Sequence, residues 1–147
     1  MHVPIVVTAL VGEIGAVVAN VVAKKLAQDF LNLETNINIH LAGAVQGKYS
    51  HQDLQKFEQQ QICLALQKNT VIFVPFDVFV HNKNLFSGKK VFYVFVPKSV
   101  VPTFDVAMQI AFDDRDKFLS QHAEKIDFFN FDIEKIASEI IKKVRTK

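Results

Sequence analysis

Long apolar runs alternate along this chain with stretches in which apolar residues recur every three or four positions. Three of these runs, Ile5–Leu10, Val71–Val78 and Val91–Val96, are nearly continuous and rich in Val, Ile and Phe. They lack the alternation of a strand with one wet face, and are typical of parallel strands buried on both faces. We therefore predict three central strands, with two shorter strands at Phe30–Leu33 and Ile126–Phe129.

Helical periodicity marks the segments between and after the strands. We predict helices over Ala16–Ala27, His51–Lys68, Phe104–Gln121 and Asp132–Arg145. The last is the clearest, because its Ile, Ala and Val residues share one face and its charged residues the other. Asp132 is placed to cap its start. Strands that alternate with helices predict an α/β fold, a three-layer α/β/α sandwich with a mostly parallel sheet.

Length and charge narrow the classes of function. The chain has 147 residues, of which 50% are hydrophobic, so we expect one α/β domain spanning 1–147. The net charge of +2 comes from 17 basic and 15 acidic residues. Nucleic-acid binding usually requires a concentrated basic surface, and we expect no nucleic-acid partner.

Two further features bear on location. Cys63 is the single cysteine, so no internal disulfide can form, and we predict a reducing, cytoplasmic compartment with Cys63 buried on a helix. Glu13 interrupts the apolar N-terminal stretch before it could span a bilayer. We interpret that stretch as a core strand running into a core helix, and expect no membrane partner.

The turn after the first strand is the candidate ligand site, since ligands of open α/β sheets bind where the first strand feeds the first helix. It contains Gly12 and Gly15. A phosphate loop, G-x-x-x-x-G-K-[ST], starting at Gly12 would next require Gly, Lys and Ser or Thr, where the chain has Val17, Val18 and Ala19. Gly12 and Gly15 are thus candidate cofactor-binding residues of a degenerate phosphate loop.

The order of features over nearly the whole chain resembles the shikimate kinase family of small P-loop kinases. After the phosphate-loop helix, that family has Asp-x-Asp behind a short strand, where this chain has Asn32 and Glu34 in FLNLE. The family's next helix carries a Phe-Arg pair, and its arginine grips the shikimate carboxylate. Here the pair is Phe57-Glu58.

The second half of the chain continues the resemblance. A buried strand runs into three glycines in the family and into Pro75-Phe76-Asp77 here, and a later strand ends at a proline, here Pro97. The family then has Arg followed by Tyr and Ala four and eight residues on, matched by Arg115, Leu119 and Ala123. The resemblance implies a P-loop-kinase fold.

The departures from the family bear on function. The loop lysine, the loop hydroxyl that holds magnesium and the first Asp of Asp-x-Asp map to Val18, Ala19 and Asn32. On the shikimate side the resemblance leaves Glu34 and Arg115 as candidate substrate-binding residues. The segment between Pro97 and Arg115 also lacks the family's Arg-rich lid. We expect no catalytic residue and no cofactor.

Three other interpretations stay open. A divergent ATP- and Mg-dependent small-molecule kinase could recruit Lys24, Lys25 or Arg115. A sensor could have kept a nucleotide or anion site at the glycine turn. A dinucleotide fingerprint in VTALVGEIG, with Glu34 for the ribose, is disfavoured because neither Tyr is followed by Lys in Tyr-x-x-x-Lys.

Other reactive residues give no motif. The five histidines do not fall at metal-ligand spacing. We interpret Asp113, Asp114 and Asp116 as an exposed helix end rather than as a metal site. We therefore expect no metal. Of the fourteen phenylalanines, those near the last strand and those around the place of the glycine triplet exceed what one face of a small sheet needs. Some could refill a former substrate pocket or form a partner patch. We therefore predict a non-catalytic binding or interaction module with a protein partner or self-association.

Overall fold

The sheet of this protein is parallel throughout, with strand order β2-β3-β1-β4-β5. The computed structural model describes residues 4–34, 51–97 and 106–145. The strands in these ranges are β1 (Ile5–Ala9), β2 (Asp29–Asn32), β3 (Thr70–Pro75), β4 (Lys90–Val94) and β5 (Glu124–Ile126).

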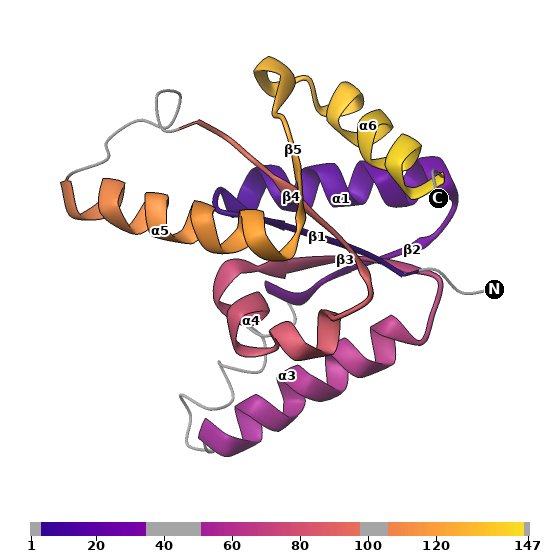
Figure 1. Cartoon of the computed structure of the whole chain (residues 1–147). Coiled ribbons are helices and arrows are strands. Elements are labelled where there is room, and N and C mark those ends of the chain that lie inside the picture. Colours follow the sequence, from indigo (N-terminus) through magenta and orange to yellow (C-terminus); the bar gives the residue numbers. More distant parts are fainter. Residues whose placement is uncertain (1–3, 35–50, 98–105, 146–147) are drawn as a thin grey trace.

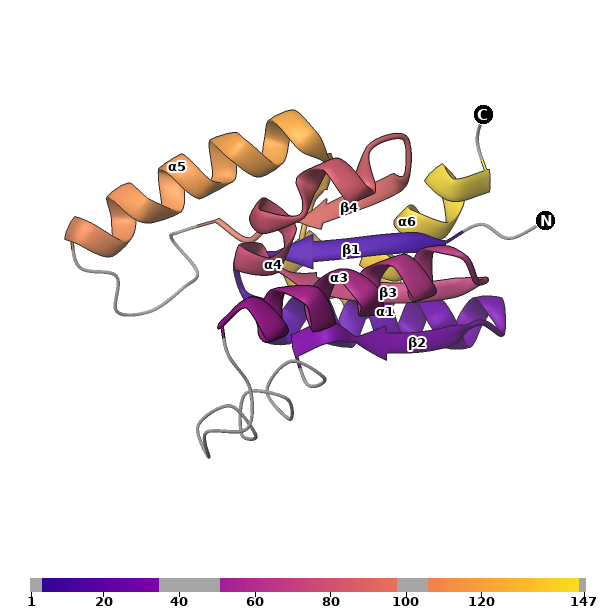
Figure 2. The same ribbon diagram turned by 90° about the horizontal axis from the view of Figure 1, so that it is seen from below.

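Helices cover both faces of the sheet (Figures 1 and 2). They are α1 (Gly12–Leu26), α3 (His51–Leu66), α4 (Phe76–His81), α5 (Val106–His122) and α6 (Ile133–Arg145), with short 3-10 turns η1 (Lys83–Phe86) and η3 (Phe129–Phe131). Helices α1 and α6 pack on one face, and α3, α4 and α5 lie on the other. The predicted three-layer α/β sandwich is confirmed.

Strand β1 runs through the middle of the sheet and is buried along its whole length. Ile5 and Val7 join the core beneath α1 and α6, whereas Val6 joins the core beneath α3 and α4. Because both faces are covered, the strand can be apolar on both sides, which explains the nearly continuous apolar run, with Thr8 as the one polar residue of β1.

Helix α6 forms as its periodicity predicts. The backbone N–H of Lys135 donates to Oδ1 of Asp132 at 3.1 Å, so Asp132 is the N-cap. Ile136, Ala137 and Ile140 are buried against α1 and the sheet. Lys142, Lys143 and Arg145 lie in the last turn, where cations offset the helix dipole.

Two predicted strand ends are wrong by three residues. The predicted strand Val71–Val78 ends at Pro75, and α4 begins at Phe76, because a short apolar run fits a buried helix as well as a strand. The last strand ends at Ile126, where we predicted it to begin.

Two further observations concern the surface and the helices. Cys63 lies on α3, as predicted, but is exposed rather than buried, because it follows the inward-facing Ile62 on the outer side of that helix. None of the helices in the described ranges is both long and apolar enough to cross a membrane.

Candidate functional site

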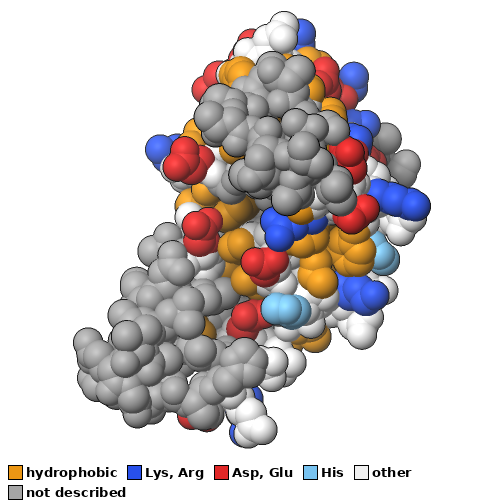
Figure 3. All heavy atoms as spheres, turned by 90° about the vertical axis from the view of Figure 1, so that its left-hand side faces the viewer, with side chains coloured by type: hydrophobic (Ala, Val, Ile, Leu, Met, Phe, Trp, Pro, Cys, Tyr) orange, Lys and Arg blue, Asp and Glu red, His pale blue; other side chains and the backbone are white. Residues whose placement is uncertain are grey.

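All strands of the sheet end at one edge, and the candidate ligand site lies there. At this edge β1 feeds α1, β3 feeds α4, and β2 leads to Glu34. Figure 3 looks at this side of the molecule, the left-hand side of Figure 1, and shows acidic, basic and hydrophobic side chains interspersed. The described residues on this view form no continuous basic surface of the kind that would attract a polyphosphate.

The connection from β1 to α1 is short. β1 ends at Ala9 and α1 begins at Gly12, so Leu10 and Val11 form the whole turn. Val11 is the N-cap and provides no side-chain hydrogen bond, while its carbonyl accepts from the N–H of Gly15 at 3.2 Å. We predicted the helix to start at Ala16; it starts one turn earlier, so Gly12 and Gly15 lie in the helix rather than in an open loop.

This geometry allows the phosphate-loop motif to be tested in more than one frame. A phosphate loop lies between the end of a strand and the start of a helix, so its first residue must fall between Ala9 and Gly12. In the four possible frames the lysine position is occupied by Gly15, Ala16, Val17 or Val18, and the hydroxyl position by Ala16, Val17, Val18 or Ala19. None of these supplies an ammonium or hydroxyl group, and the turn therefore does not fit Mg-ATP.

Gly15 has a packing reason to be glycine. A Cβ at this position would lie 2.6 Å from Cε1 of Phe73 and 2.9 Å from Cβ of Ala9. The missing side chain lets α1 lie directly on β1 and β3. On the next turn Val18 and Ala19 are fully buried in the same core, so neither position could present a side chain to a ligand.

The first turn of α1 is acidic. Its charged side chain is Glu13, which is exposed. A carboxylate at a helix N-terminus stabilises the helix by about 0.3–1 kcal/mol through the dipole. The same charge repels phosphate, which would otherwise be attracted to the free N–H groups there.

The nearest lysines along the chain lie at the far end of this helix. Lys24 and Lys25 occupy the last turn of α1, and Lys25 pairs with Glu134 on α6 at 2.8 Å. Twelve residues of helix separate Gly12 from Lys24, which corresponds to roughly 18 Å. Lys24 and Lys25 thus lie at the end of α1 that is far from the Gly12 turn.

Glu58 takes part in a contact that sequence reasoning missed. The resemblance described above would place a substrate-binding arginine at this position. Here Oε1 of Glu58 accepts a hydrogen bond from Nδ2 of Asn82, which also donates to the carbonyl of Val78 at 2.9 Å. Asn82 is buried and follows α4, so the pair ties α3 to the end of α4.

The two candidate substrate-binding residues make different contacts. Glu34 is exposed, and its N–H donates to Oδ1 of Asn32 at 3.0 Å, which closes the turn after β2. The Arg115 guanidinium, also exposed, lies 4.8 Å from the ring centre of Phe76. Phe76 stands where the family has its glycine triplet, and meets Phe118 of α5 edge to face at 6.1 Å. The aromatic side chains thus occupy space between α4 and α5.

A polar network beneath α5 was also missed from the sequence. The Tyr93 hydroxyl, on β4, donates to Oδ1 of Asp116 at 2.8 Å, and Nζ of Lys125 lies 3.1 Å from the same oxygen. Burial, together with the hydrogen bond to Asp116, raises the pKa of Tyr93 well above its ordinary value. Asp116 therefore holds α5 to the sheet. Within the described ranges no three His, Cys, Asp or Glu side chains gather as a metal site would require.

Comparison of the structure with known structures identifies the fold. Shikimate kinase from Aquifex aeolicus vf5 matches with a TM-score of 0.72 and 14% identity, over 96% of this chain and 95% of that one. Shikimate kinase from Bacteroides thetaiotaomicron matches with a TM-score of 0.68 and 14% identity, over 98% and 99%. A gluconokinase from Sinorhizobium meliloti 1021 matches with a TM-score of 0.59 and 12% identity, over 97% and 93%.

Sequence comparison adds nothing to this result, since no family model matches the chain. No curated protein matches it in sequence either. At this level of identity the structural likeness concerns the fold alone, and the fold is that of the shikimate kinases and related P-loop kinases.

Proposed function

We propose that this chain, which has the fold of small P-loop kinases, is a non-catalytic binding or interaction module. The observation that carries the proposal is the start of α1. It follows β1 after two residues, it has no cationic or hydroxyl side chain in any phosphate-loop frame, and it carries the exposed Glu13.

The energetics of phosphoryl transfer support this proposal. The reaction depends on positioning the phosphates and neutralising their charge with lysine, arginine and magnesium. Each charge-assisted hydrogen bond is worth roughly 1.5–3 kcal/mol, and every ~1.4 kcal/mol corresponds to a factor of ten in rate. Losing the lysine and the magnesium-binding hydroxyl together therefore costs on the order of two to four powers of ten.

The residues on the other side of the crevice support it as well. The family's carboxylate-binding arginine is replaced by Glu58, which is bonded to Asn82. The place of the glycine triplet is taken by Pro75 and by Phe76, whose ring lies under Arg115. Both the nucleotide side and the substrate side thus lack the groups that a shikimate kinase requires.

A protein partner, or self-association, is the binding that we propose. Phe131 is 46% exposed in the segment between β5 and α6. It belongs to three successive residues, Phe129 to Phe131, with positive φ values of 47°, 54° and 64°. Such backbone is costly for residues other than glycine and is concentrated at functional sites. An exposed aromatic ring held in this way is suited to a protein contact.

An activity assay tests the non-catalytic proposal. Purified protein is incubated with Mg-ATP and either shikimate or gluconate, and both ADP and phosphorylated product are measured. We expect no product above a mock preparation. The matched variants are Arg115→Ala and Lys117→Ala, each of which removes one exposed cation from α5.

The variants make a positive signal interpretable. Product formation that is lost in Arg115→Ala and kept in Lys117→Ala would contradict the proposal and establish a divergent kinase. Product formed equally by both variants and by the mock preparation would come from a contaminating kinase, and the proposal would stand.

A further inference from the structure

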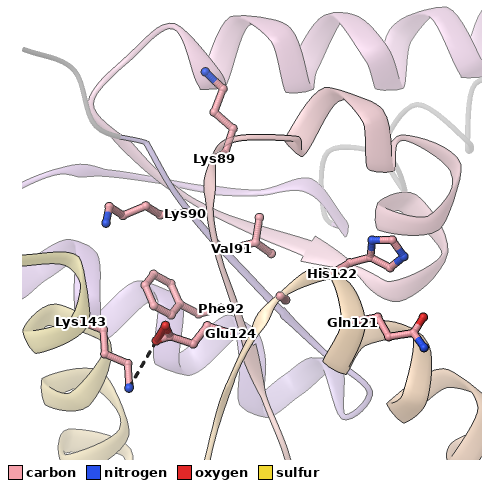
Figure 4. Close-up of a pocket in the computed structure, with 9 residues that line it drawn as sticks. Lys89, Lys90, Val91, Phe92, Gln121, His122, Glu124 and Lys143 are labelled. Atoms are coloured by element: carbon pink, nitrogen blue, oxygen red, sulfur yellow. Dashed lines mark ion pairs between the residues drawn. The ribbon is translucent and has the colours of Figure 1, made fainter. Parts of the chain in front are cut away.

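A basic hollow lies at the edge of the sheet opposite the crevice, where β4 and β5 begin (Figure 4). It consists of two adjoining cavities of about 370 and 450 Å³ that share Lys89, Gln121 and His122. Its walls come from η1, the start of β4, the end of α5, the start of β5 and the last turn of α6. Small-molecule sites commonly have volumes of about 300–1,000 Å³, so the hollow is of suitable size for a small molecule.

The charge of the hollow is strongly one-sided. Four lysines line it against a single carboxylate: Lys83, Lys89, Lys90 and Lys143, with Glu124 as the acid. Glu124 already pairs with Lys143 at 3.4 Å. In Figure 4 Lys89, Lys90 and Lys143 lie on one side of the hollow, and His122 and Gln121 on the other. The lining of a space the size of a metabolite thus carries three positive charges in excess.

The helix dipole does not explain these lysines. Cations are common at helix C-termini because they offset the partial negative charge there. The basic residue in the last turn of α5 is His122, and Lys143 performs this role for α6. Lys83, Lys89 and Lys90 belong instead to η1, the following turn and β4, so another reason is needed for three lysines in the lining of one hollow.

Contacts within the protein hold part of this lining in place. The centre of the Phe118 ring lies 4.5 Å from the centre of the His122 ring and 5.9 Å from Nζ of Lys83. The turn before β4 places Ser87 beside Lys89 through Gly88, whose φ of +76° suits glycine. The turn therefore contributes one hydroxyl residue, Ser87, and one lysine, Lys89, to the lining of the hollow, and Lys90 follows at the start of β4.

We propose that this hollow binds a small molecule bearing at least two phosphate charges. Lysine binds phosphate as a compact point charge with three donors, and Ser87 and Gln121 offer neutral hydrogen bonds beside the lysines. The lysines line one side of an open hollow of limited size, whereas a nucleic-acid surface would present them along an extended stripe. The site is separate from the crevice and does not depend on the function proposed above.

The test uses inorganic pyrophosphate as the probe, titrated into the full chain and followed by calorimetry at low salt and at ~0.15 M salt. Lys89→Gln/Lys90→Gln removes two charges from the hollow, and Lys24→Gln/Lys56→Gln removes two exposed charges from α1 and α3. We expect the first variant to bind at least about tenfold more weakly and the second to bind like the wild type.

Three results would overturn the proposal. The first is the absence of pyrophosphate binding by the wild-type protein at both salt concentrations. The second is equal binding by the two double variants, which would place the anion elsewhere. The third is binding of a single-stranded RNA, but not of pyrophosphate, that is lost in Lys89→Gln/Lys90→Gln. Far-UV circular dichroism of each variant verifies that the fold is retained.

Discussion

Replacing Gly15 by alanine should lower the free energy of unfolding by roughly 1–3 kcal/mol, the usual cost of overpacking a core. The added Cβ would meet Cε1 of Phe73 at 2.6 Å and Cβ of Ala9 at 2.9 Å. Phe73 is fully buried on β3, so its ring cannot move aside without disturbing the core. Chemical denaturation measures the change, and the thermal midpoint should fall by about 2–4 °C per kcal/mol for a domain of this size.

Whether Gly15→Ala lowers or raises the free energy of unfolding decides why this residue is glycine. Alanine is better than glycine in an unconstrained helix by about 1 kcal/mol, so a glycine kept for any reason other than packing should gain stability on substitution. Ser138→Ala, at an exposed position of α6, is the matched control and should be neutral or slightly stabilising. An increase in stability for Gly15→Ala would show that the close contact between α1 and the sheet is not as described.

Tyr93→Phe should lower the free energy of unfolding by roughly 1.5–3 kcal/mol, because it removes a part-buried hydrogen bond to a carboxylate. The Tyr93 hydroxyl donates to Asp116 at 2.8 Å, and Asp116 also pairs with Lys125. Asp116→Asn and the double variant complete a cycle that isolates the coupling between the two side chains. Asp114→Asn, on the exposed side of the same helix, should be near neutral.

The same residue predicts a dependence on alkaline pH. Burial and Asp116 raise the folded-state pKa of Tyr93, while an unfolded tyrosine titrates near pH ~10. Above that pH the unfolded chain releases a proton that the folded chain retains, so stability should fall by up to ~1.4 kcal/mol per pH unit. Between pH ~9 and ~11, about one unit on either side of the ordinary tyrosine pKa, Tyr93→Phe should lose less stability than the wild type. Equal loss of stability with pH in the variant and the wild type would contradict a buried Tyr93 hydroxyl that is bonded to Asp116.

Much of the fold was predictable because long helices and buried strands leave periodic patterns. The charged and apolar faces of α6 identified that helix and its cap at Asp132. The boundary between β3 and α4 was not predictable, because Phe76, Val78 and Phe79 continue an apolar run that fits either structure. The unbroken hydrophobicity there reflects burial and does not specify a backbone conformation.

The candidate site was predicted in position but not in detail. The glycine turn lies at the strand edge where the alternation of strands and helices placed it. The start of α1 at Gly12 was missed, because the family pattern assigned those residues to a loop. The bond between Glu58 and Asn82, and that between Tyr93 and Asp116, join residues 24 and 23 positions apart. Only tertiary structure brings such pairs together.

The packing role of Gly15 could not be read from the sequence either. A glycine near a strand end is compatible with a ligand-binding turn and with a close helix contact, and the two differ only in what surrounds the missing side chain. The neighbours Phe73 and Ala9 decide between them here. The basic hollow was invisible for the same reason, since its lysines come from separate elements.

The most direct test of the central claim is the thermal unfolding midpoint measured with and without millimolar Mg-ATP, Mg-ADP and shikimate. The Lys89→Gln/Lys90→Gln variant is used beside the wild type, so that binding in the basic hollow is separated from binding at the Gly12 turn. A ligand at a hundred times its dissociation constant would stabilise the fold by about 2.7 kcal/mol, or several degrees. We predict no shift in the variant with any of the three ligands. A shift of several degrees with nucleotide in that variant would contradict the account.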